Sequence, residues 1–125
     1  MRAYTVATVA LTLKVTRKWL DNTLSHNRVD GVVQSRQGVS RSLSPHAVLT
    51  LDIALRLAED LEMPLKRALT VASHLARSQK NGSYALSRGF SIALDLDRLV
   101  EEITARLARA VEITPLPRRG RPSAK

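Results

Sequence analysis

Arginine, lysine and amide side chains follow a helix-capping residue near the start of the chain, in a pattern that suits DNA binding. Thr16 is followed by Arg17, Lys18 and Asn22. Arginine can donate two hydrogen bonds to guanine and asparagine can pair with adenine, whereas lysine more often holds a phosphate. A short helix whose first turns carry these residues is suited to the major groove. The competing interpretation is an ordinary solvated helix face.

Enzymatic and metal chemistry find little support in the sequence. It has no G-x-S-x-G motif, no phosphate-binding loop and no dinucleotide-binding glycine motif. There is no cysteine, and His26, His46 and His74 lack metal-ligand spacing. We therefore expect a protein that is not an enzyme and binds no cofactor or metal.

The charge is unevenly distributed along the chain. Residues 1–50 contain seven basic and two acidic residues, a net charge of +5, and residues 51–114 contain nine of each sign. Residues 115–125 add four basic residues and no acid, which completes the net charge of +9. Two basic ends around a neutral middle favour nucleic acid as a partner.

Helix signals and a hairpin signal alternate over the first 78 residues. Thr5 can cap a helix with an apolar stripe of Val6, Val9, Ala10 and Leu13, and Thr16 caps a second helix that ends at residues 25–27. Residues 32–35 and 39–43 flank Arg36-Gln-Gly and predict a hairpin, which we call the wing. Ser44-Pro45 then starts a helix that runs to Leu61, and Pro64 starts another.

The rest of the chain predicts a second hairpin and a last helix. Residues 80–83 are expected to form a loop, and 84–86 and 90–94 to form strands. Asp95 or Asp97 caps a helix from Leu96 to about Val111, with Glu101, Glu102, Arg106 and Arg109 outside. Its apolar stripe, which includes Leu99, Ile103 and Leu107, serves either ordinary burial or a homodimer seam.

Residues 4–50 resemble the MerR-type winged-helix domain. The resemblance rests on Thr5-Val6-Ala7, on residues 15–19 (Val-Thr-Arg-Lys-Trp) and on residues 41–44 (Arg-Ser-Leu-Ser). It implies that the second helix and the wing contact operator DNA through Arg17, Lys18, Asn22, Arg36 and Arg41. The sequence departs from the family at Leu43, where an aromatic residue is usual, and it lacks the family's long dimerising helix in its usual form.

The C-terminal tail resembles an AT-hook. Arg119-Gly-Arg121-Pro is the core of that motif, which implies that its arginines lie in the narrow minor groove of A·T-rich DNA. Arg118 stands where proline is usual, so Arg118, Arg119 and Arg121 are alternatively a nonspecific phosphate-binding or solubilising tail.

These observations predict a mainly α protein: a winged helix-turn-helix with small β-hairpins and a basic disordered tail. We divide the chain into a DNA-binding domain (1–78), a hairpin and helix that can dimerise (79–114) and the tail (115–125). The expected function is sequence-specific binding of duplex DNA by a homodimer, as a transcriptional regulator of bacterial or phage type. With no signal-peptide pattern and no apolar run of about 18 residues, we expect a cytoplasmic, nucleoid-associated protein without a membrane partner.

Three other functions remain open on the sequence. The first is a DNA-architectural or recombination accessory factor that resembles phage excisionases. The second is an RNA- or ribosome-associated basic protein. The third is an antitoxin-like module that grips a protein partner through the last hairpin and helix.

Overall fold

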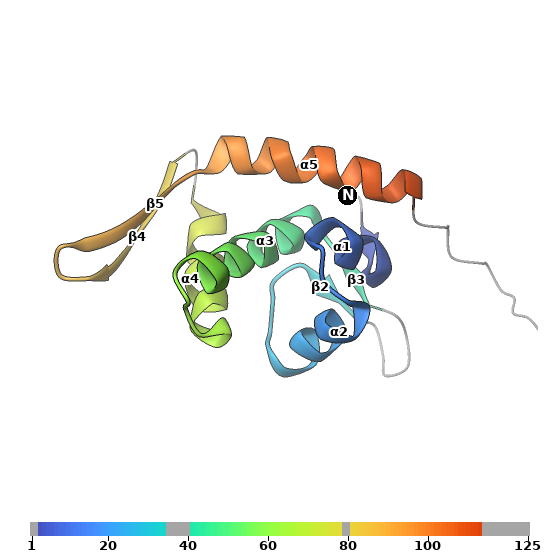
Figure 1. Cartoon of the computed structure of the whole chain (residues 1–125), viewed down its shortest axis with the longest axis horizontal. Helices are drawn as coiled ribbons and strands as arrows, with labels where there is room; N and C mark the ends of the chain where they lie inside the picture. Colours follow the sequence, from blue (N-terminus) through green and yellow to red (C-terminus); the bar gives the residue numbers. More distant parts are fainter. Residues whose placement is uncertain (1–2, 35–40, 79–80, 114–125) are drawn as a thin grey trace, which may run out of the picture.

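Helices dominate the structure, and two small antiparallel sheets accompany them (Figure 1). The computed structural model describes residues 3–34, 41–78 and 81–113. Its elements are β1 (Tyr4–Thr5), α1 (Val6–Leu13), α2 (Arg17–His26), β2 (Val32–Val33), β3 (Ser42–Leu43), α3 (Pro45–Asp60), α4 (Leu65–Arg77), β4 (Asn81–Ser87), β5 (Phe90–Asp95) and α5 (Leu96–Ile113). The prediction of a mainly α fold with small hairpins is therefore confirmed. The predicted tail lies outside the described residues.

Hydroxyl and carboxylate caps start four of the helices. The side chains of Thr5, Thr16 and Ser44 accept hydrogen bonds from the backbone three residues ahead, at 3.1, 3.0 and 3.2 Å. Each bond satisfies an amide that has no partner inside its helix. These three predicted helix starts are confirmed, and Asp95 caps α5 through the amide of Arg98 at 3.2 Å.

A three-stranded sheet of order β1-β3-β2 joins the beginning of the chain to the base of the wing. Leu43 of β3 lies opposite Tyr4 on one side and Val32 on the other, and its side chain is fully buried. The pairing of β1 with β3 has no signal in the neighbouring sequence. Gly31 precedes β2 with φ of +93°, and a Cβ there would fall on Ser44 Oγ, so this close approach requires glycine.

The helix α3 runs through the middle of the protein. Every residue from 47 to 54 is buried, and α3 packs against α4, α5 and β3. This stretch is buried on all sides and six of its eight residues are apolar, as expected for a helix that is covered by several neighbours. The same hydrophobic core includes side chains from both predicted segments, 1–78 and 79–114.

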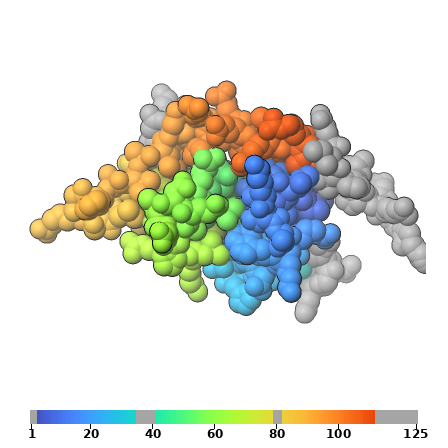
Figure 2. Space-filling model, viewed as in Figure 1, coloured from blue at the N-terminus to red at the C-terminus, as the bar shows by residue number. Residues whose placement is uncertain are grey.

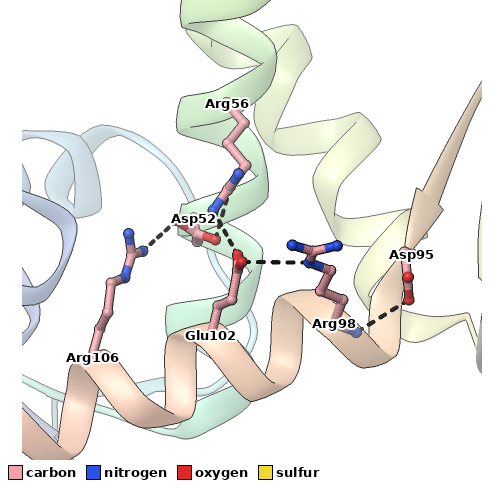
Figure 3. A network of polar contacts seen from close by, with 6 residues as sticks. All are labelled: Asp52, Arg56, Asp95, Arg98, Glu102 and Arg106. Atoms are coloured by element: carbon pink, nitrogen blue, oxygen red, sulfur yellow. Dashed lines mark hydrogen bonds and ion pairs between the residues drawn. The ribbon is translucent and has the colours of Figure 1, made fainter.

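The buried carboxylate of Asp52 binds α5 to α3 (Figure 3). Arg106 Nη2 lies 2.9 Å from Asp52 Oδ1, and Arg56 Nε lies 3.2 Å from Oδ2. Glu102 extends this network at 3.6 Å to both Arg56 and Arg98. The expectation that Arg106 lies outside the helix bundle is therefore wrong, because its side chain pairs with a carboxylate in the core.

The second hairpin forms as predicted, with one correction. β4 and β5 pair antiparallel around a turn that contains Gly89 at φ +81°. Residues 81–83, expected to belong to a loop, form the start of β4. A Cβ at Gly82 would lie only 3.0 Å from Ser78 Cβ, so the absence of a side chain lets the strand begin directly against the end of α4.

We predict that Asp52→Ala destabilises the protein by about 2 kcal/mol, because it leaves Arg106 without its partner in the core. Urea unfolding measures this change. The matched control is Glu101→Ala, which removes an exposed carboxylate from α5 and should change stability by less than about 0.5 kcal/mol. Equal effects of the two substitutions would contradict the assigned role of Asp52.

Candidate nucleic-acid interface

The helix α2 has a buried face and an exposed polar face. Leu20, Thr23 and Leu24 are buried. Arg17, Lys18 and Asn22 are all exposed. Helical spacing puts Lys18 and Asn22 on the opposite side, whereas Arg17 is exposed because it is the first residue of the helix. All three residues of this helix that the sequence predicts as DNA contacts are therefore accessible.

Helix stability does not explain the two cations at the beginning of α2. The first turn contains Arg17 and Lys18 and no acidic residue. The partial positive charge of a helix N-terminus favours anions there by about 0.3–1 kcal/mol and disfavours cations similarly. Free backbone amides and two basic side chains at the same end are instead suited to an external anion such as phosphate.

Arg41 joins the base of the wing to α2. Its Nη1 lies 3.2 Å from Asp21 Oδ1, and its Nη2 donates to Ser25 Oγ at 2.9 Å. The side chain is 19% exposed, so both terminal nitrogens are held against the helix. The sequence predicts Arg41 as a DNA contact, whereas this geometry lets it orient the wing and neutralise the acidic residue on the polar face of α2.

Four other predicted DNA contacts, Arg36, Arg118, Arg119 and Arg121, lie outside the described residues.

The structure adds a basic face on α4 that the sequence analysis missed. This helix contains Lys66, Arg67 and Arg77 and no acidic residue. A cleft of about 210 Å³ separates it from the end of α2, lined by His26, Asn27, Arg28, Lys66, Leu69, Thr70 and Ser73. In the net charge of residues 51–114, the acids of other elements conceal this face. A count restricted to the predicted helix after Pro64 would have found it.

The apolar stripe of α5, which could form a dimer interface, is largely buried inside the protomer. Ile103 and Leu107 are 3% and 2% exposed and belong to the core with α1 and α3. Ordinary burial, the alternative kept open above, therefore accounts for these two residues. Leu99 is half-buried and stays accessible.

Comparisons with family models, curated proteins and solved structures found no match for this chain. No helix in the described part of the chain is long and apolar enough to cross a membrane. Nor do the described residues contain a group of three or more histidine, cysteine or acidic side chains arranged to hold a metal ion.

We predict that Arg41→Ala loosens the wing from α2 while it lowers stability by no more than about 1 kcal/mol, since the ion pair is partly exposed. Hydrogen exchange should become faster in β2 and β3 but not in α3. Asp21→Ala should have a similar effect, and the double substitution should add little to either one because the two side chains act as a pair. Additive effects, or an equal effect of the control Arg28→Ala, would contradict the pairing.

Proposed function

We propose that this protein binds duplex DNA sequence-specifically as a winged helix-turn-helix transcriptional regulator of bacterial or phage type. The proposal rests on one observation. Arg17 and Lys18 lie exposed in the first turn of α2, and Arg41 links this helix to the base of a hairpin. A helix that enters the major groove by its first turns, with a hairpin fixed beside it, is a common geometry for reading DNA.

The arrangement of the first elements supports this proposal. Lys14, Val15 and Thr16 form a short connection between α1 and α2. The main-chain amide of Lys14 donates to the end of α1, and Lys14 itself is left-handed with φ of 60°, so the chain turns sharply here. β2 and β3 pair at the base of the wing, and the bond from Arg41 to Ser25 holds this base against α2, which supports the proposal.

Duplex DNA fits this surface better than double-stranded RNA. The major groove of B-form DNA, about 12 Å wide, admits an α-helix, whereas that of A-form RNA is deep and narrow. In this proposal the exposed side chains of Arg17 and Asn22 contact bases. Lys18 and the basic face of α4 contact phosphates, which fix the register without reading sequence.

Selection from a randomised duplex library, followed by titration against duplex DNA and structured RNA, tests the proposed function. We expect a preferred duplex sequence, and an affinity that falls with salt by a slope of about 0.9 per phosphate contact. No enriched sequence, salt-insensitive binding or a preference for structured RNA would contradict it.

Single substitutions on α2 test the assignment of roles. Arg17→Ala and Asn22→Ala should relax the sequence preference by about 1–3 kcal/mol per lost base contact, because each removes a side chain that reads a base. Lys18→Ala should weaken binding to all sequences equally. The control is Arg109→Ala, which removes an exposed cation from α5, on the opposite side of the protein from α2 (Figure 1). The assignment is wrong if all variants keep the parent's preference.

We also propose that the tail adds affinity through its four basic residues, Arg118, Arg119, Arg121 and Lys125. Deleting residues 115–125 should then weaken binding. A hook in the minor groove predicts a larger loss on A·T-rich flanks than on G·C-rich flanks, because only the former narrow the groove. Equal losses of affinity would indicate that the tail binds phosphates nonspecifically. No loss on either kind of flank would exclude a role for the tail in DNA binding.

A further inference from the structure

The hairpin of β4 and β5 projects from the body as a narrow arm (Figures 1 and 2). Phe90, Ile92 and Leu94 of β5 alternate onto one face of this arm. Ile92 and Leu94 are half-buried near the body, whereas Phe90 at the tip is 70% exposed. Because a two-stranded hairpin is marginally stable alone, an apolar stripe that continues to its tip indicates that something covers the arm.

An apolar groove lies at the base of the same arm. It has a volume of about 450 Å³ and is formed by the end of α3, by β5 and by the beginning of α5. Its apolar lining comes from Leu57, Leu61, Ile92, Leu94 and Leu99. Phe90 is not among the lining residues, so the aromatic tip and the groove both remain uncovered in one protomer.

The charges at the two ends of the arm are complementary. Arg88 is exposed at the tip, next to Phe90. The charged residues that line the groove are Arg56, Asp60, Asp95, Arg98 and Glu102. Glu102 pairs with both arginines, whereas Asp60 forms no ion pair within the described residues. Asp60 therefore favours a ligand that combines an apolar side chain with a neighbouring cation.

Composition also indicates that the arm contacts protein. Within residues 81–95 only Arg88 and Asp95 are charged, whereas the arm contains a tyrosine and a phenylalanine. Depletion of charge and enrichment of aromatic residues are typical of the centre of a protein interface. The tip of a second copy has both features that the groove requires.

We propose that the protein forms a twofold homodimer in which the hairpin tip of each copy occupies the groove of the other. Phe90 packs against Leu61 and Leu99 of the second copy, and Arg88 pairs with its Asp60. Two equal contacts close the assembly, which avoids the open chains that a single tip-to-groove contact would build. The proposal concerns assembly alone and is independent of DNA binding, although a twofold dimer suits paired half-sites in DNA.

Light scattering on the full-length chain, over a dilution series, gives the dimer dissociation constant. We expect twice the protomer mass of 13.8 kDa at tens of micromolar. Phe90→Ser should raise the dissociation constant by about thirtyfold, as for a central aromatic contact, without changing the circular dichroism spectrum. The matched control is Val33→Ser, which removes another exposed apolar side chain, in β2, and should leave the dissociation constant unchanged.

A charge exchange tests the pairing of tip and groove. Asp60→Arg and Arg88→Asp should each weaken the dimer, because each places like charges together, and the two combined should recover at least tenfold in affinity over either one. Asp60 ends α3 and forms no ion pair within the described residues, so its replacement by arginine should leave the fold intact. A monomer at tens of micromolar, a dimer unaffected by Phe90→Ser, or a double variant without recovery would each overturn the proposal.

Discussion

The buried carboxylate of Asp52 constrains how the rest of the chain packs. It lies within the stretch of α3 where every residue is buried, and an unpaired charge there would cost several kcal/mol. Arg56 supplies one partner from the next turn, but the second, Arg106, comes from α5. The register of α5 across α3 is therefore the one that brings Arg106 to Asp52, and this register places Ile103 and Leu107 in the core. The pairing is incomplete, since Arg106 Nε is buried without an acceptor in the described part of the chain.

The position of α5 also determines which surfaces remain free. Because the helix uses its apolar stripe inside the protomer, its own accessible apolar groups, Leu99 and Val100, lie near its beginning, close to the arm that precedes it. The helix α2 lies on the other side of α1 from α5 (Figure 1). The proposed DNA surface and the proposed dimer surface are thus separate, and one can be occupied without blocking the other.

Local signals in the sequence predicted the helices well, because a cap depends on residues three positions apart. Thr5, Thr16 and Ser44 illustrate this. The errors arose where distant residues decide the structure. The beginning of β4 depends on how closely Gly82 approaches the end of α4, and the position of Arg106 depends on Asp52, 54 residues away. Neither relation leaves a signal in the neighbouring sequence.

The candidate site shows the same division between local and distant information. Exposure of Lys18 and Asn22 followed from the helical pattern, and that of Arg17 from its position at the start of the helix. The bond between Arg41 and Asp21 instead needed the sheet that brings the wing to α2. The charge of α4 was missed for another reason, because a sum over the whole middle of the chain conceals the difference between neighbouring helices. That part sums to zero, yet it contains the basic face of α4 and the acidic residues Glu59 and Asp60 at the end of α3. A segment that looks electrostatically neutral therefore contains regions of opposite sign, for which we propose different partners: phosphates for α4, and the Arg88 tip of a second copy for Asp60 of α3.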